Sequence, residues 1–263
     1  AAAQEGNEAS ERLRHCAAQL KQALDQQWRE QRYVRAITDA GEELIFDDAL
    51  MSSWPILSGA VDAAHGEKAL GHGLSALERD GIVLLLTPPF DTQSKPRPGR
   101  IAQYPPGVRE NGAQYSHGSS WLVDAALHLA EQLEQQGNAS AAQHWRTRAG
   151  TVWHKISPLT HTAPERWLNY GLEPHQQAAD VYFGPGYEGR GGWSWYTGSA
   201  ARMLSAAWGL LGLEFRAGQL HVAPWAQKGE VWPHLQQVEW RGHVYRMENG
   251  KMVEVTAVPA DGN

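Results

Sequence analysis

Two segments rich in glycine and proline carry the residue types of this 263-residue chain that are best suited to chemistry. The first, residues 104–117, reads YPPGVRENGAQYSH, and the second, residues 189–199, reads GRGGWSWYTGS. Each places charged, amide and aromatic side chains on a backbone that glycine allows to turn sharply. Such a mixture can hold a ligand with many hydroxyl groups in a fixed orientation.

The ends of these two segments could bind an anion. Thr197 and Gly198 directly precede an apolar stretch expected to be helical from about 199 to 211, and His117 precedes another from about 119 to 135. The free N–H groups at the start of a helix attract anions, and a hydroxyl or imidazole beside them adds a donor. Taken singly, Thr197 is better explained as a helix cap, and His117 as a structural histidine.

Carboxylates in the same region have two interpretations each. Arg109 and Glu110 could form an internal ion pair or contact a ligand, and Asp180 could hold its loop or bind sugar. Asp47 and Asp48 are adjacent, so on a helix their side chains would point apart, and we interpret them as acids of a helix's first turn. The sequence contains no metal-ligand spacing, no phosphate- or dinucleotide-binding glycine motif and no serine nucleophile motif, so we expect no metal or cofactor.

The elements that must position these residues can be read from the periodicity of apolar residues. Helices are expected at about 8–30, 47–64, 67–78, 119–135, 140–157 and 199–211, separated by long irregular segments at 87–112 and 158–196. The last fifty residues alternate in the manner of strands, with turn signals at Arg241-Gly242 and Asn249-Gly250. The order predicts an α-rich body over residues 1–212 and an antiparallel β module over residues 213–263.

Composition narrows the class of partner and compartment. A formal net charge of −6 gives no basic field for nucleic acid, and no apolar run approaches the roughly 20 residues that span a bilayer. The single cysteine, Cys16, favours a reducing, cytoplasmic location. The chain has 12 tryptophans, a residue that stacks on sugar rings and also fills protein cores, so this number alone does not decide between the two.

At four places the sequence resembles glycoside hydrolase family 94, which comprises the cellobiose and chitobiose phosphorylases and the phosphorylase module of cyclic β-1,2-glucan synthase. Residues 104–117 are similar to the family's Y-P-P-G-x-R-E-N-G-G-Q-Y-T-H, and residues 190–199 to R-G-G-W-T-W-Y-T-G-S. Residues 173–182 are similar to E-P-Y-x-x-A-A-D-V-Y, and residues 53–59 to S-W-A-V-L-S-G. The segment LLLTPPFD at 84–91 favours the cyclic glucan synthase branch.

The resemblance implies a mainly α fold: the C-terminal part of an (α/α)6 toroid, followed by a small antiparallel β-sandwich-like domain. It also implies inverting phosphorolysis, in which inorganic phosphate, a co-substrate, attacks a β-glucoside and gives an α-sugar 1-phosphate. By correspondence of motifs, phosphate would contact His117, Thr197 and Gly198. Sugar would contact Glu110, Arg109 and Tyr115 in the acceptor subsite and, more loosely, Gln114, Asp180, Arg190 and Trp193.

The chain also departs from the family. The family's general acid lies in an Asp-Trp-Asn-Asp segment upstream of the matched region, which these 263 residues do not contain, and an upstream phosphate-binding arginine is missing with it. About six long helices are also too few for a closed toroid of twelve. We therefore expect the C-terminal portion of a β-glucoside phosphorylase, inactive when isolated.

Two alternative functions remain at this stage. One is a non-catalytic module that binds glucan or docks to a glucan synthase. The other is a hydrolase with an (α/α)6 barrel, for which Glu110 and Asp180 are the only carboxylate pair to nominate. The expected partners are a β-glucan or β-linked oligosaccharide, inorganic phosphate and the N-terminal part of the same protein, with no nucleic acid. A homodimer stays open, as does attachment to a membrane-bound synthase.

Overall fold

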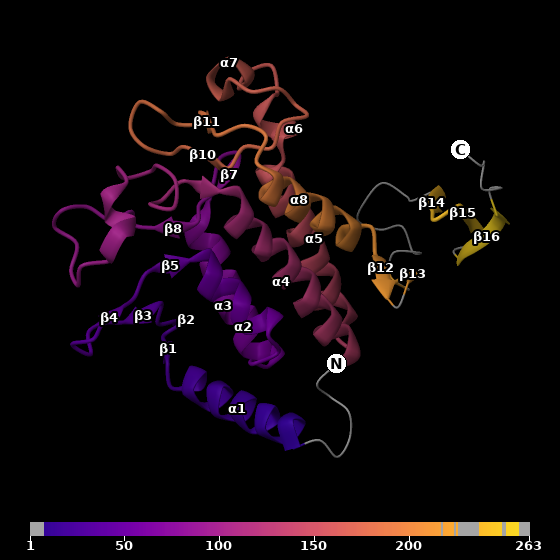
Figure 1. Cartoon of the computed structure of the whole chain (residues 1–263), viewed down its shortest axis with the longest axis horizontal. Helices are drawn as coiled ribbons and strands as arrows, with labels where there is room; N and C mark the ends of the chain where they lie inside the picture. Colours follow the sequence, from indigo (N-terminus) through magenta and orange to yellow (C-terminus); the bar gives the residue numbers. More distant parts are fainter. Residues whose placement is uncertain (1–7, 217, 224, 226–236, 249–250, 258–263) are drawn as a thin grey trace.

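The computed structural model describes residues 8–216, 218–223, 225, 237–248 and 251–257. It confirms the mainly α prediction, and the described helices do not close into a ring (Figure 1). The helices are α1 (Glu8–Asp25), α2 (Ala49–Leu57), α3 (Ala63–Leu77), α4 (Ser116–Gln135), α5 (Ala139–Ile156), α6 (Pro158–His161), α7 (Trp167–Tyr170) and α8 (Thr197–Leu210). None of them is long and apolar enough to cross a bilayer.

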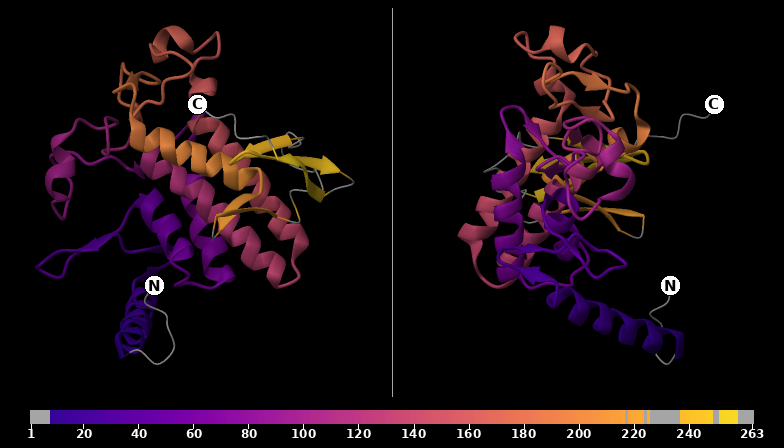
Figure 2. Two further views of the ribbon diagram at one scale, coloured as in Figure 1. Left: turned by 45° about the vertical axis from the view of Figure 1, so that its right-hand side comes forward. Right: turned by 90° about the vertical axis from the view of Figure 1, so that its left-hand side faces the viewer.

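Helix α4 lies at the centre and packs against α2, α3, α5 and α8 (Figures 1 and 2). It can do so because it carries a wide buried face, on which Leu122, Leu129 and Leu133 alternate with alanines and serines. Burying each leucine stabilises the fold by roughly 1.5–3 kcal/mol, and the small residues between them let the neighbouring helices approach closely. The central helix, α4, therefore also carries His117 in its first turn.

The first two predicted helices are shorter than expected. Helix α1 ends at Asp25, and Trp28 instead begins a hairpin of β1 (Trp28–Arg29) and β2 (Arg32–Tyr33). The apolar stripe of α1 is partly uncovered, with Leu13 56% and Leu20 71% exposed, and α1 projects away from the other helices in Figures 1 and 2. The expected helix at 47–64 ends at Leu57 as α2, because Gly59 adopts a positive φ of 69°. The helix expected at 67–78 begins earlier, at Ala63, where Asp62 caps α3.

Backbone hydrogen bonds gather the starts of α2, α4 and α8 at one end of the bundle. Ala49, the first residue of α2, donates to Leu85, whose own N–H donates to Ala113 just before α4. Ser116, the first residue of α4, donates in turn to Ala179. The last link is a three-stranded sheet, ordered β11–β10–β9, in which β9 (Gln114–Tyr115) leads into α4 and β11 (Gly191–Gly192) precedes α8, with β10 (Asp180–Val181) between them.

The two irregular segments predicted from glycine and proline are confirmed, and they touch each other. The backbone of Gly107 crosses that of Phe183 and Gly184 so closely that a Cβ on Gly107 would lie 2.2 Å from the Gly184 nitrogen. Gly107 also has a φ of 79°. A side chain at this crossing is therefore excluded both by the close contact and by the backbone conformation. The short elements within and around these segments are β3 (Ala36–Ile37), β4 (Glu43–Leu44), β5 (Asp47–Asp48), β6 (Glu78–Arg79), β7 (Ile82–Val83), β8 (Leu86–Thr87) and the 3₁₀ helix η1 (Gly99–Gln103).

The C-terminal strands pair antiparallel. They are β12 (Leu213–Arg216), β13 (Gln219–Val222), β14 (Gln237–Trp240), β15 (His243–Glu248) and β16 (Lys251–Ala257). The predicted turn at Arg241-Gly242 joins β14 to β15, and both of its residues have positive φ, as such a two-residue turn requires. The turn at Asn249-Gly250 lies outside the described residues, and packing of these strands into a sandwich stays a prediction.

Candidate functional site

The starts of α4 and α8 bring His117 and Gly198 together. A Cβ placed on Gly198 would lie 3.3 Å from Nδ1 of His117 and 3.7 Å from its Cε1. The imidazole therefore lies against the first turn of α8, next to Thr197. The two segments singled out from the sequence thus converge at this point.

Both of these helix starts lack a side-chain cap. Asp48, Asp62 and Asn138 each accept a first-turn N–H of their helix, at the starts of α2, α3 and α5. Tyr115 and Tyr196 hold the corresponding positions before α4 and α8, and neither side chain accepts such a bond among the described residues. Two neighbouring helix starts with uncapped N–H groups form a region of positive potential that suits an anion.

The surroundings of His117 keep its ring neutral near pH 7. Burial, and after it the positive charge of Arg202, holds the pKa of His117 below its usual value. Arg202 itself forms an ion pair with Asp124, one helix across. On another side the ring packs edge-to-face against Trp121, with ring centres 5.2 Å apart. An anion at this site would favour the imidazolium form and raise that pKa again.

The two tyrosines that precede the helices face each other. The hydroxyl oxygens of Tyr115 and Tyr196 are 3.3 Å apart, and burial followed by this hydrogen bond raises the pKa of Tyr115. Both hydroxyls can serve a ligand as hydrogen-bond donors or acceptors.

Arg109 joins the two segments a short distance away. Its guanidinium carbon lies 5.6 Å from the ring centre of Tyr104 and 5.0 Å from that of Trp193, and its Nε is 3.5 Å from Oε2 of Glu110. Arg109 and Trp193 have positive φ values of 52° and 55°, an uncommon conformation that costs about 1–3 kcal/mol per residue. The Trp193 ring is 67% exposed, so its outer face is open to a ligand.

Two residues assigned to sugar binding by resemblance, Gln114 and Asp180, are fully buried. Oε1 of Gln114 accepts the N–H of Val83, and its Nε2 lies 3.2 Å from Nε2 of His161, so the amide is used inside the protein. Asp180 lies beneath Gly192, where a Cβ would come within 2.8 Å of its Oδ1. The assignment of Gln114 and Asp180 to sugar binding stays a prediction.

The buried Asp180 carboxyl is electrostatically unusual. Burial raises its pKa to about 6, against the opposing charge of Arg109. Neither of its oxygens accepts a well-formed hydrogen bond within the described residues. The charges of Asp180 and Arg109 therefore influence each other.

Arg190 is exposed between β10 and β11. Its backbone carbonyl accepts the N–H of Tyr182, and its charge lowers the pKa of the same tyrosine, which burial raises overall. No contact of the described structure brings Arg190 to His117. Its assignment to the sugar subsites stays a prediction.

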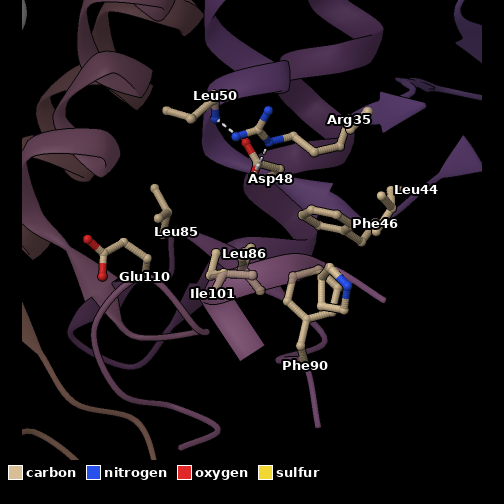
Figure 3. A pocket seen from close by; sticks show the side chains of 12 residues that line it. Arg35, Leu44, Phe46, Asp48, Leu50, Leu85, Leu86, Phe90, Ile101 and Glu110 are labelled. Atoms are coloured by element: carbon tan, nitrogen blue, oxygen red, sulfur yellow. Dashed lines mark hydrogen bonds and ion pairs between the residues drawn. The ribbon is translucent and has the colours of Figure 1, made fainter. Parts of the chain in front are cut away.

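The sequence did not reveal a pocket of about 310 Å³ beside the start of α2 (Figure 3). Asp48 closes one side: its carboxylate accepts the N–H groups of Leu50 and Met51 and the Nε of Arg35, at 2.7, 3.2 and 3.1 Å. Asp48 is thus an N-cap and not a first-turn acid, and Asp47 instead pairs with Arg32 and His72. The pocket is lined by Arg35, Ala36, Leu44, Phe46, Asp48, Leu50, Leu85, Leu86, Phe90, Pro98, Ile101 and Glu110.

Comparison with known proteins places the chain in a family. The model of the catalytic domain of the glycosyl hydrolase 94 superfamily matches residues 1–212, up to the loop between α8 and β12. The chain is 37% identical over 181 residues to the cyclic beta-(1,2)-glucan synthase NdvB of Rhizobium meliloti (strain 1021), covering 67% of this chain and 6% of that protein. It is 26% identical over 204 residues to the solabiose phosphorylase of Paenibacillus borealis, covering 74% of this chain and 24% of that protein. The chain thus spans only a small part of either relative.

Proposed function

Because the chain belongs to the glycosyl hydrolase 94 superfamily, we propose that it is the C-terminal portion of an inverting β-glucoside phosphorylase. It supplies the phosphate site and sugar subsites, while the general acid comes from sequence outside these 263 residues. One observation carries the proposal: His117 lies against Gly198 where two uncapped helix starts meet.

In this reaction an oxygen of phosphate attacks the anomeric carbon as the bond to the leaving sugar oxygen breaks. The leaving oxygen takes a proton from the general acid, and the product is a sugar 1-phosphate of inverted configuration. Phosphate is itself the nucleophile, so no carboxylate base is needed. What this chain must do is hold the anion in line with the bond, and it does so with the N–H groups of Gly198 and its neighbours, the Thr197 hydroxyl and the His117 imidazole.

The acceptor sugar would lie on the other side of the bond, against the Arg109–Glu110 segment. Oε2 of Glu110 is buried against Nε of Arg109, but the Glu110 side chain as a whole is 31% exposed, so its carboxylate can accept a hydrogen bond from a sugar hydroxyl. Trp193 offers an exposed ring to a sugar face, and Tyr115 a hydroxyl. Arg109, held between two aromatic rings, orients the Glu110 carboxylate.

A hydrolase is the second candidate, and the raised pKa of Asp180 is the observation in its favour. A hydrolase needs one protonated carboxyl and one carboxylate on either side of the bond, and Glu110 with Asp180 would be that pair. Asp180, however, is fully buried beneath Gly192. This geometry favours phosphorolysis with an external acid.

Calorimetry on the 263-residue chain tests the proposal against a simple glucan-binding module. A β-1,2-linked glucose disaccharide is titrated with and without inorganic phosphate. We expect tighter sugar binding with phosphate present, and no sugar 1-phosphate formed by the isolated chain. Sugar binding that ignores phosphate would favour the binding module, and turnover by the isolated chain would contradict the proposed origin of the acid.

Activity should appear when the chain is joined to the N-terminal part of the same protein. We expect that longer protein to release sugar 1-phosphate from a β-glucan or β-linked oligosaccharide in the presence of phosphate. Release of free glucose in its place would support the hydrolase.

A further inference from the structure

The pocket beside α2 adjoins the proposed acceptor subsite. Glu110 lines it at one end, the rings of Phe46 and Phe90 lie at the other, and the Arg35–Asp48 pair closes a side between them (Figure 3). Phe46 and Phe90 pack edge-to-face with centres 4.9 Å apart, which fixes the floor of the pocket. On the basis of the proposed function, we propose that this pocket is a further glucosyl subsite, which holds the sugar unit next to the one bound by Glu110.

The position of the pocket along the bundle supports this assignment. The anion site lies between the starts of α8 and α4, whereas the pocket lies beside the start of α2, on the other side of α4. Adjacent packed helices are about 8–10 Å apart, so the pocket is too far from the anion site to hold the ring that phosphate attacks. It lies on the side to which the leaving chain extends.

The polar groups of the pocket match the needs of a sugar. Both oxygens of Asp48 are already occupied, by two backbone N–H groups and by the Nε of Arg35. Only that Nε of Arg35 is engaged among the described residues, so its two Nη groups remain as donors. Together with the side chain of Glu110 at the other end of the pocket, they give hydroxyl groups a donor fork at one point and a carboxylate acceptor at another.

The apolar side chains of the pocket suit the apolar faces of the same sugar ring. Leu44, Leu86, Ile101 and the two phenylalanines offer C–H-rich walls to the apolar faces of a sugar ring. The volume of about 310 Å³ lies at the lower end of that of small-ligand sites, roughly 300–1,000 Å³. A single ring with its hydroxyls directed at Arg35 and Glu110 fits this combination better than a wholly apolar ligand, which would form no hydrogen bond with either side chain.

The test compares β-1,2-linked glucose oligomers of two and three units by calorimetry, in saturating phosphate. We expect the trisaccharide to bind the 263-residue chain roughly tenfold tighter than the disaccharide, as one added set of hydrogen bonds to charged groups would give. The variant Ala36→Phe places a ring in the pocket from its exposed rim and should abolish the gain without changing disaccharide affinity. Arg35→Lys keeps a cation beside Asp48 but removes the donor fork, and should remove part of the gain.

Ile37→Phe is the matched control, because Ile37 follows Ala36 on β3, points to the opposite face and is 52% exposed. It should leave the gain intact. Equal affinity for the two oligomers, or a gain that survives Ala36→Phe, overturns the subsite while leaving the proposed function in place. Failure of the disaccharide to bind at all overturns the proposed function and the subsite with it.

Discussion

Replacing Gly198 by alanine should weaken anion binding without lowering the stability of the fold. The new Cβ would lie 3.3 Å from Nδ1 of His117, closer than side chains normally approach, so the ring must move by a few tenths of an ångström. A hydrogen bond to a charged group contributes about 1.5–3 kcal/mol, so displacing the imidazole should weaken phosphate binding by roughly 10- to 150-fold. Alanine meanwhile favours helix over glycine by up to about 1 kcal/mol in a helix interior, and by less in the first turn. Gly198→Ala should therefore lose phosphate affinity while keeping or slightly gaining stability.

The assay is phosphate titration by calorimetry at pH 7, paired with urea unfolding of the same variants. Gly71→Ala is the matched control, since Gly71 lies within α3 and its added Cβ would come no closer than 3.9 Å to Trp145. It should be at least as stable as the wild type and bind phosphate unchanged. Phosphate affinity of Gly198→Ala within twofold of the wild type, or an equal loss in Gly71→Ala, would refute the idea that His117 and α8 share one anion.

Three further predictions concern charge. Sulfate, a dianion that does not titrate near neutrality, should bind with uptake of a proton by His117, because the pKa of His117 is low in the free protein. Sulfate should therefore bind more tightly as pH falls from 8 to 6. Calorimetry in buffers of different ionisation heat measures the proton uptake, and His117→Gln should remove it. Because the folded pKa of Asp180 is raised to about 6 from 3.8, the folded state binds more protons between these values and stability falls as pH rises through them, by about 3 kcal/mol. Asp180→Asn should lack this fall in urea unfolding at pH 4.5 and 7.5, and an unchanged pH profile would contradict the assignment. Asp48→Ala should destabilise by about 1–2 kcal/mol through loss of the α2 cap, while Asp48→Asn, which still caps, should lose less; equal losses would count against the capping role.

Sequence periodicity predicted those helices whose apolar faces are buried. The stretch at 119–135 became α4 because Leu122, Leu129 and Leu133 recur at helical spacing on a face that neighbours cover. At 8–30 the same signal predicted a helix that is too long, because the helix ends at Asp25 and a hairpin begins at Trp28. The strands of this hairpin have two residues each, which is too short to show any periodicity. Asp48 was placed within a helix for a related reason, since a cap and a first-turn acid differ by one position.

The resemblance supplied most of the site residues, but how deeply each one is buried depends on contacts between segments that are far apart in the sequence. Gln114 and Asp180 sit in two-residue strands of one small sheet. Gln114 is buried where its amide meets Val83 and His161, and Asp180 where Gly192 of β11 lies over it. The pocket beside α2 draws on Arg35, Phe90 and Glu110, which are far apart in sequence and lie in irregular segments. No local pattern relates such residues, so sequence alone could not have predicted their meeting.

Nuclear magnetic resonance during a phosphate titration tests the central claim most directly. The imidazole nitrogens of His117 and the backbone amides of Thr197 and Gly198 should shift together, with one dissociation constant, because one anion contacts them all. Shifts confined to His117 or to the α8 start alone, or two different dissociation constants, would contradict a shared phosphate site.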